Sequence, residues 1–382
     1  MSDPFQLAQR LQARRDQHLY RQRRVLESPQ QAHIQCDGKT LRNFSSNDYL
    51  GLANHPAVVA ASQKAAAEYG FGSGASHLVI GHSRVHHELE ERLAEWVGRP
   101  RALLFSTGYM ANLGVISALL ERGDTVVQDK LNHASLLDGA QLSRGQLQRY
   151  HHNDLGSLQQ RLQQAGGRVL VATDSVFSMD GDIAPLQDMA HLCRQQNAWL
   201  MVDDAHGLGV LGQGHGCLRE YDLSLEQVPV YMGTLGKALG SYGAFVAGSE
   251  DLIEFLIQSA RSYIYTTAMP PSVAAASLAS LEVLAAEPWR VERLQDLIGR
   301  FTRGALAMGL PMMPSTTAIQ PLLVQDSEQA LQLSATLLER GFLVGAIRPP
   351  TVPANAARLR ITLSAAHSEQ DIDDLLNALA SN

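Results

Sequence analysis

One lysine of this sequence lies in a loop whose composition suits the chemistry of an amine. The stretch Met232–Gly243 reads M-G-T-L-G-K-A-L-G-S-Y-G, and its lysine, Lys237, follows an apolar run, Val228–Met232. The glycines of the stretch are Gly233, Gly236, Gly240 and Gly243. Glycine tolerates positive φ and lets a flat ligand approach the backbone closely. We therefore predict that the Lys237 amine condenses with a bound aldehyde, and the alternative is an exposed lysine on a surface turn.

A carboxylate and a histidine follow another apolar run, upstream of this loop. The run Trp199–Val202 is typical of a buried strand, and Asp203 and His206 come after it. Ligands of parallel sheets bind at the carboxyl ends of the strands. An aldehyde cofactor that needs a carboxylate on its ring nitrogen is pyridoxal phosphate, whose protonated ring accepts electrons. We predict that Asp203 makes this contact and that His206 bonds the ring's phenolic oxygen; singly, each residue could instead be a helix cap or a satisfied polar group.

A third segment predicts a site for an anion. A strand ending at Phe105 is followed by Ser106-Thr107-Gly108, and apolar residues then recur at helical spacing from Tyr109 to Leu120. A helix N-terminus with a hydroxyl cap offers backbone N–H groups to a phosphate. The helix dipole contributes only about 0.3–1 kcal/mol, so several N–H groups and a covalent link would be needed. Capping alone also explains the two hydroxyl residues.

The histidines of this sequence favour a stacking role over a metal site. His82 and His86 have the spacing of some metal ligands, but no third-ligand pattern such as HExxH follows. We therefore predict no metal centre. His133 opens a predicted helix after a strand that ends near Asp129, where its imidazole could stack on a pyridine ring.

Composition sets the class of protein. The chain has 382 residues, of which 45% are apolar, which is enough for a large core and two or three domains. A net charge of −7 gives no reason to expect a nucleic-acid partner. No apolar run approaches the roughly 18 residues of a membrane span, and no secretory leader is evident. Cys36, Cys193 and Cys217 lack CxxC spacing, so we expect reduced thiols and a cytoplasmic protein.

Helical and short apolar segments alternate between His55 and Gly248. Such alternation is typical of βαβ units, so we predict an α/β fold with a mostly parallel sheet covered on both faces. The predicted helices are Pro56–Tyr69, Val85–Val97, Tyr109–Leu120, Leu155–Ala165 and Leu186–Asn197. The predicted strands are Ala102–Phe105, Thr125–Gln128, Val169–Thr173, Trp199–Val202, Val228–Met232 and Ala244–Ala247.

The two ends of the chain have other patterns. Pro4–Val25 is predicted to be an arginine-rich helix on the body of the protein, since its aspartates and lack of serine differ from a transit peptide. After helices at Asp251–Arg261, Ser272–Ala286 and Val291–Met308, the order is strand, helix, strand, strand, helix: Ile319–Val324, Gln329–Arg340, Leu343–Ile347, Leu359–Leu363 and Glu369–Leu379. We therefore divide the chain into a helical arm (1–50), a large α/β domain (51–287) and a small α+β domain (288–382).

Two arginines of the small domain are candidates for carboxylate binding. Alternation along their strand sends Arg358 and Arg360 to the same face. A guanidinium group there could form two parallel hydrogen bonds with a carboxylate. Surface charge that keeps the protein soluble is the alternative.

Seven stretches of the sequence together resemble the α-oxoamine synthases. They are F-S-S-N-D-Y-L-G-L, S-T-G-Y-M-A-N, L-N-H-A-S, S-V-F-S-M-D-G-D, D-D-A-H-G, G-T-L-G-K and I-R-P-P-T-V-P, and the resemblance covers nearly the whole chain. It implies the aspartate aminotransferase-like fold of pyridoxal phosphate enzymes (fold type I) and a homodimer with active sites at the subunit interface. The implied activity is an acyl transfer, the decarboxylative condensation of L-alanine with a pimeloyl thioester of coenzyme A or acyl carrier protein.

The resemblance also implies roles for single residues. It makes Lys237 the Schiff-base residue, Asp203 the partner of the ring nitrogen and His206 that of the ring oxygen, with His133 stacked on the ring. Gly108, Tyr109, Ser178 and Thr234 would hold the cofactor, and Thr266 would reach the phosphate of the neighbouring subunit. Asn47 and Arg360 would take the amino-acid carboxylate, while Arg21, Arg348 and Thr351 would bind the acyl substrate.

Two alternatives stay open at this point. 2-Amino-3-ketobutyrate ligase and 5-aminolevulinate synthase, which acylate glycine, share the lysine, aspartate and histidine, and one methyl group is worth only about 1–3 kcal/mol of discrimination. A protein that keeps the fold for binding or assembly without catalysis is the other alternative. The intact Lys237, Asp203, His206 and His133 speak against it, since a scaffold needs none of their chemistry.

Overall fold

The computed structural model describes residues 3–17 and 19–381 of the chain. The chain forms two compact units. The sheet unit comprises Asn47–Ser178 and Asp182–Arg293, and the terminal unit comprises Met1–Ser46, Met179–Gly181 and Leu294–Asn382. The three-part division at residues 50 and 287 stays a prediction. Among the described residues, no helix is long and apolar enough to cross a lipid bilayer.

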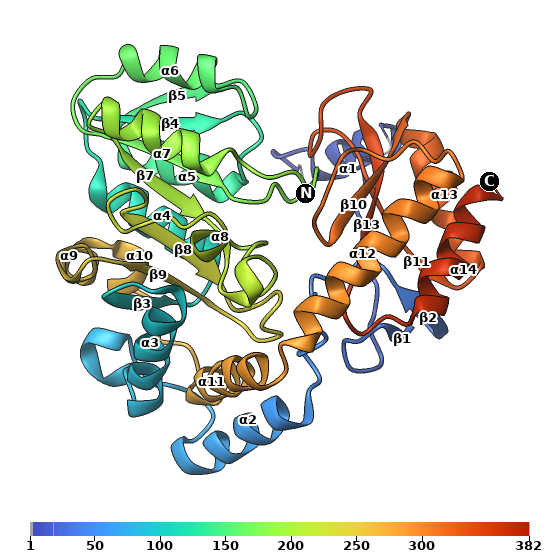
Figure 1. Ribbon diagram of the computed structural model, residues 1–382, viewed down its shortest axis with the longest axis horizontal. Coiled ribbons are helices and arrows are strands. Elements are labelled where there is room, and N and C mark those ends of the chain that lie inside the picture. Colours follow the sequence, from blue (N-terminus) through green and yellow to red (C-terminus); the bar gives the residue numbers. More distant parts are fainter. Residues whose placement is uncertain (1–2, 18, 382) are drawn as a thin grey trace. The chain divides into compact units, whose positions relative to one another are not determined.

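A seven-stranded sheet is the centre of the sheet unit, with the order β3-β9-β8-β7-β6-β4-β5 (Figure 1). Its strands are β3 (Arg101–Phe105), β4 (Thr125–Asp129), β5 (Gln146–Tyr150), β6 (Val169–Asp174), β7 (Trp199–Asp203), β8 (Val230–Thr234) and β9 (Ala244–Gly248). Only β9 runs against its neighbours, so this is the mostly parallel sheet that the alternating pattern predicts. The carboxyl ends of β6, β7 and β8 therefore meet at one edge, where Asp174, Asp203 and Met232 are in register.

Helices cover both faces of this sheet. They are α2 (Pro56–Tyr69), α3 (Arg84–Val97), α4 (Gly108–Leu119), α5 (Ala134–Ser143), α6 (Leu155–Gln163), α7 (Leu186–Gln195), α8 (Cys217–Glu220), α9 (Glu250–Ser259), α10 (Arg261–Ile264) and α11 (Pro271–Ala286), with a π-helical turn, η1 (His77–Gly81), and a 3-10 turn, η2 (Gly212–Gly214). Every residue of β4 and of β9 is buried, although successive side chains point to opposite faces. Both faces are thus packed, as parallel sheets require.

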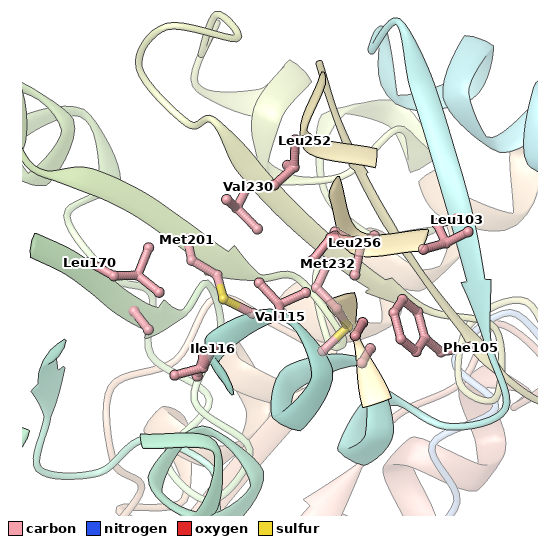
Figure 2. Packing of buried hydrophobic residues seen from close by; sticks show 14 of the residues in the cluster. Leu103, Phe105, Val115, Ile116, Leu170, Met201, Val230, Met232, Leu252 and Leu256 are labelled. Carbon is pink, nitrogen blue, oxygen red and sulfur yellow. The ribbon is translucent and has the colours of Figure 1, made fainter. Parts of the chain in front are cut away.

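One apolar cluster fixes α4 to the strands that carry the polar residues. Val115 and Ile116 of α4 are fully buried against the sheet, with Met201 of β7 and Val230 and Met232 of β8 in the same cluster (Figure 2). Burying one such side chain stabilises the fold by about 1.5–3 kcal/mol. The first turn of α4 is therefore held beside the ends of β7 and β8.

The terminal unit is built from short strands and helices. Its elements are α1 (Leu7–Asp16), β1 (His33–Cys36), β2 (Lys39–Asn43), α12 (Trp289–Ala307, in this unit from Leu294), β10 (Ile319–Gln325), α13 (Ser327–Glu339), β11 (Phe342–Leu343), β12 (Gly345–Ile347), β13 (Ala357–Thr362) and α14 (Glu369–Ala380). They include two three-stranded sheets, β1-β2-β11 and β10-β13-β12. In the second sheet β13 is central and antiparallel to both neighbours.

Some predicted elements are wrong. The helix predicted at Pro4–Val25 is limited to α1; residue 18 lies outside the described residues, and residues 19–25 are not helical. No residue of α1 is buried, and a ten-residue helix without a packed face is marginal in water. The strand predicted at Leu343–Ile347 is two short strands, β11 and β12. β5 and the pair β1 and β2 were not predicted, because their sequences are largely polar.

Candidate active site

Asp203 is the last residue of β7 and is only 4% exposed. Asn112 Nδ2, on α4, donates to Asp203 Oδ2 at 2.8 Å, and the backbone N–H of Ala205 donates to Asp203 Oδ1 at 3.0 Å. A buried carboxylate without such donors would be costly. The two hydrogen bonds thus hold the carboxylate in one orientation at the edge of the sheet.

His133 precedes α5 and is linked to Asp203 through two side chains. Its Nδ1 lies 2.7 Å from Ser135 Oγ, and Asn112 Nδ2 donates to the same hydroxyl at 2.9 Å. The backbone N–H of His133 donates to Asp174 Oδ2 at 2.8 Å. The pKa of His133 is lowered, first by loss of solvation and then by Lys237, while Asp203 acts in the opposite direction. The ring is therefore neutral at neutral pH, with its exposed side open to a ligand.

Lys237 lies in the turn between β8 and β9 and is half-buried. Its charge acts on His133 and also favours the carboxylate of Asp174, whose pKa burial and the nearby Asp203 raise. The amine therefore belongs to the same electrostatic site as the carboxylates at the ends of β6 and β7. The sheet's parallel order brings these groups together, as we expected from the strand-end positions.

The glycines around Lys237 serve packing more than ligand access. A Cβ atom on Gly240, which has a φ of +59°, would lie 2.3 Å from the backbone nitrogen of Ala53. On Gly233 a Cβ would lie 2.7 Å from the ring of Phe245. Only Gly236 has its nearest atom at an ordinary contact distance, 3.5 Å. Gly233 and Gly240 are therefore required by neighbouring parts of the chain, and Gly240 has the positive φ that we expected. The approach of a flat ligand to this loop stays a prediction.

His206 is bonded to a tyrosine that sequence reasoning missed. Its Nδ1 lies 2.6 Å from Tyr49 Oη, and the Tyr49 hydroxyl also lies 3.3 Å from Asn47 Oδ1. Tyr49 is fully buried. Its position within N-D-Y-L-G-L was the available signal, but a tyrosine in a polar turn has no pattern of its own. Through these two hydrogen bonds, the Tyr49 hydroxyl links two predicted site residues, His206 and Asn47.

The segment that we expect to bind an anion forms the start of α4. Thr107 is the N-cap, and its Oγ1 accepts from the Met110 N–H at 3.1 Å. Gly108 and Tyr109 follow in the first turn, whose N–H groups have no acceptor within the helix. A Cβ on Gly108 would lie 2.8 Å from Thr234 Cγ2, so a larger residue there would displace the end of β8. Gly108 and Thr234 are thus neighbours.

Of the other residues predicted to hold the cofactor, Tyr109 and Thr266 lie near this helix start. The ring of Tyr109 meets that of His133 edge-on, with centroids 6.2 Å apart. Thr266 follows α10 and precedes Thr267, whose carbonyl oxygen accepts from Ser106 Oγ at 3.4 Å. Ser178 is half-buried at the end of a sheet-unit segment.

Asp204, the second carboxylate after β7, has other partners. Its Oδ2 accepts from the Tyr231 hydroxyl and from the Cys217 N–H, each at 2.8 Å, and Ser175 Oγ donates to its Oδ1. Burial raises the pKa of Asp204 to about 6, against these hydrogen bonds. Asp204 therefore stabilises the chain that follows β7, whereas Asp203 is linked to His133 through Asn112 and Ser135.

The remaining predicted residues belong to the terminal unit. Arg21, Arg348 and Thr351 line one cavity of about 610 Å³. The pKa of Arg348 is lowered, first by burial and then by the nearby charge of Arg21. This cavity therefore has a positive lining that suits an anionic ligand.

Arg358 and Arg360 differ in their partners. Both are buried in β13. Arg358 forms an ion pair with Asp180 and donates to the carbonyl oxygen of Ala356 at 3.0 Å. Arg360 Nη1 donates to Thr362 Oγ1 at 3.0 Å. The ion pair of Arg358 thus stabilises the fold. Because both arginines are buried, neither serves as a surface charge that keeps the protein soluble.

Comparison with known proteins agrees with this layout. The sequence matches the family model for aminotransferase class I and II over residues 39–379. The 8-amino-7-oxononanoate synthase of Stutzerimonas stutzeri is 61% identical over 377 residues, which are 98% of this chain and 96% of that protein. The enzyme of the same name from Pseudomonas putida strain W619 is 62% identical over 98% of this chain and 97% of its own length.

Solved structures show the same fold. The serine palmitoyltransferase of Sphingomonas wittichii has a TM-score of 0.94 at 32% identity, covering 100% of this chain and 98% of its own. A variant of the serine palmitoyltransferase of S. paucimobilis, solved with a bound PLP–myriocin aldimine, has a TM-score of 0.93 at 32% identity, covering 99% of this chain and 96% of its own. The 8-amino-7-oxononanoate synthase of Francisella tularensis has a TM-score of 0.79 at 32% identity, covering 89% and 97%. The chain belongs to the aminotransferase class I and II family.

Proposed function

We propose that this chain is a pyridoxal phosphate-dependent acyltransferase that condenses L-alanine with a pimeloyl thioester. The products are 8-amino-7-oxononanoate, an intermediate of biotin synthesis, together with carbon dioxide and the free thiol carrier. Curated relatives of that name, at 61–62% identity over 98% of the chain, support the assignment. The observation that carries it is the convergence of Lys237, His133 and Asp203 at the carboxyl edge of the sheet.

The functional groups at this edge of the sheet match the parts of pyridoxal phosphate that need a partner. Pyridoxal phosphate supplies an aldehyde that bonds an amine and a ring that accepts electrons when protonated. Asp203 would hold the ring nitrogen, His206 the phenolic oxygen and His133 the ring face. The phosphate would bind at the start of α4, where Gly108 and Tyr109 offer N–H groups. Ser178 and Thr234 would also bind the cofactor. In a homodimer, Thr266 would bind the cofactor phosphate of the neighbouring subunit.

The chain's own residues then move the proton and position the reactants. The Lys237 amine, displaced by alanine, takes the proton from the alanine Cα. Asn112 and the Ala205 N–H donate to Asp203 and hold its carboxylate in one orientation. The deprotonated Cα bonds to the thioester carbonyl carbon, and the carrier leaves as a thiolate that takes a proton from water. The carboxylate then departs as carbon dioxide, and Lys237 returns a proton to the same carbon.

Polar and basic residues would bind the two substrates. Asn47 and Arg360 would bind the alanine carboxylate. Arg21, Arg348 and Thr351 would bind the acyl substrate, whose carboxylate or carrier phosphates suit the positive lining of their cavity. We further propose that the enzyme is a cytoplasmic homodimer.

A substrate panel tests this function. The purified enzyme with pyridoxal phosphate is assayed with alanine or glycine against pimeloyl, acetyl and succinyl thioesters. Alanine with a pimeloyl thioester should give the highest kcat/KM and release one carbon dioxide per thiol. A preference for glycine with acetyl-CoA would overturn the substrate assignment while leaving the cofactor chemistry intact. Absence of turnover with every pair would favour the binding or scaffold alternative.

A further inference from the structure

A cluster of histidines and one glutamate lies at the start of α3, in residues that the proposed reaction does not use. Ligand atoms of His82, His87 and Glu90 lie within 4.8 Å of one another. His82 follows the π-helical turn η1, while His87 and Glu90 are three positions apart on α3 and so share one helix face. All three line a cavity of about 520 Å³ in the sheet unit.

Neighbouring groups orient the two inner side chains of this cluster. His82 Nδ1 lies 2.9 Å from His77 Nδ1, so its Nε2 is directed toward Glu90, with 4.0 Å between Nε2 and Oε2. Glu90 Oε1 accepts from the backbone N–H of Leu104 at 2.9 Å, which leaves Oε2 to face His82. In both His82 and Glu90, one polar atom is hydrogen-bonded to a neighbouring group, and the other faces the space between the two side chains. Metal ligands are oriented by outer partners in this manner.

His86 does not belong to the set that converges. Its Nδ1 lies 2.8 Å from Ser83 Oγ and 3.0 Å from the Ser83 N–H, and its Nε2 lies 2.7 Å from the carbonyl oxygen of Met269. Helix α3 begins at Arg84, so His82 and His86 do not lie on one helix, despite their spacing in the sequence. His87 and Glu90 thus take the place of His86 beside His82.

We propose that His82, His87 and Glu90 bind one transition-metal dication of the zinc class, with water completing its coordination. Two imidazole nitrogens and one carboxylate oxygen are ligands that zinc and its neighbours accept. Bonds of about 2.0–2.2 Å need ligand atoms closer together than 4.8 Å. His82 Nε2 and Glu90 Oε2, which are 4.0 Å apart, must approach each other slightly. His87, whose side chain is 64% exposed, closes the rest by giving up an exposed contact to Glu91 and an edge-on ring contact with His82.

The metal would tie the exit of η1 to helix α3. The turn exposes three large apolar side chains, Leu78, Val79 and Ile80. Fixing His82 to the helix limits the motion of the turn that precedes it. The expected consequence is a gain in stability that depends on metal concentration, because a ligand that binds only the folded state stabilises it.

The test is titration of the untagged holoenzyme with Zn²⁺ after removal of bound metals, followed by dialysis and metal analysis. We expect one Zn²⁺ per chain and a melting temperature that rises with Zn²⁺. The variant His87→Ala should weaken binding at least tenfold, whereas His191→Ala, which removes an exposed histidine of α7, should leave it unchanged. The buried cysteines Cys36, Cys193 and Cys217 do not compete for the ion in the folded protein.

A second variant guards against a folding artefact. Glu90→Gln retains an oxygen for the Leu104 N–H but removes the charge, so it should fold and still bind Zn²⁺ at least tenfold more weakly. Co²⁺ gives an independent readout, since its visible absorption should intensify in the wild type and in His191→Ala only. Equal Zn²⁺ affinity in the wild type and His87→Ala, or no stoichiometric binding by the wild type, would overturn the proposal.

Discussion

Asn112 Nδ2 donates to Asp203 Oδ2 across 2.8 Å, and the same amide donates to Ser135 Oγ. One amide group thus joins α4 to the end of β7 and, through Ser135, to His133. The carboxylate that would hold the cofactor ring and the imidazole that would cover it are positioned by a residue that need not touch the cofactor.

Replacing this amide should affect the cofactor more than the fold. In Asn112→Ala, Asp203 loses a buried donor, at a cost of about 1–3 kcal/mol. We expect weaker pyridoxal phosphate binding and kcat/KM lowered about 10- to 100-fold. Absorbance titration with the cofactor and steady-state assays measure both. Gln195→Ala, at the exposed end of α7, is the control, and unchanged cofactor affinity in Asn112→Ala would contradict the positioning role.

Lys237 should be required for both colour and turnover. In Lys237→Ala no amine is left at this position to bond the cofactor aldehyde or to move the Cα proton. We expect loss of the visible band of the lysine-bound cofactor and a rate lowered by about 10²- to 10⁴-fold, the usual contribution of a positioned proton-transfer group. Lys64→Ala, on an exposed face of α2, should retain both properties. A yellow, active Lys237→Ala protein would mean that another group forms the bond.

Local patterns predicted the fold class and the strand ends well. Asp203 and the lysine loop follow apolar runs, and an apolar run with a polar end is visible in a few consecutive residues. The mostly parallel sheet is also confirmed, because the alternation of helical and short apolar segments is likewise a local pattern. By contrast, the edge strand β5 reads Q-L-Q-R-Y, and α1 has arginines at helical spacing but no buried face. Burial, which decides both cases, is set by distant residues.

The connections within the site could not be predicted from the sequence. Asn112 reaches Asp203 only because α4 lies across β7 and β8, and Tyr49 reaches His206 from 157 positions away. The alternating pattern does not distinguish Arg358 from Arg360, yet Arg358 forms an ion pair with Asp180 and Arg360 donates to Thr362. The glycine at 240 is explained by Ala53, a neighbour in space only.

The hydroxyl group of Tyr49 should contribute to the use of the amino-acid substrate. Tyr49→Phe keeps the buried ring but removes the oxygen that lies near His206 and Asn47. A lost hydrogen bond of roughly 1.4 kcal/mol corresponds to a tenfold effect. We expect kcat/KM for alanine to fall about tenfold with little change in the melting temperature. Tyr150→Phe, another buried tyrosine of the sheet unit, serves as the control; an equal loss in both variants would point to packing instead.

The last prediction concerns His152, whose ring lies between two carboxylates of the sheet unit. Its Nδ1 is 3.1 Å from Asp129 Oδ1 and its Nε2 is 2.7 Å from Asp182 Oδ2. Burial lowers the pKa of His152, but hydrogen bonds to both carboxylates outweigh it and raise the pKa to about 10. The folded pKa therefore exceeds the ordinary value of 6.5. Stability from the charged ring is fully present below about pH 6.5 and is lost as the pH rises through about 10.

The variant His152→Gln should therefore be destabilised in a pH-dependent manner. At pH 6 we expect a loss of about 1–3 kcal/mol in the free energy of unfolding, as for a buried charged group that loses its hydrogen bonds. Above about pH 10 the wild type has also lost the charge, so the two proteins should converge. Urea unfolding at several pH values measures the difference, with His191→Gln as an exposed control. A difference that stays constant from pH 6 to above pH 10 would show that the ring contributes by packing, because packing does not depend on its protonation.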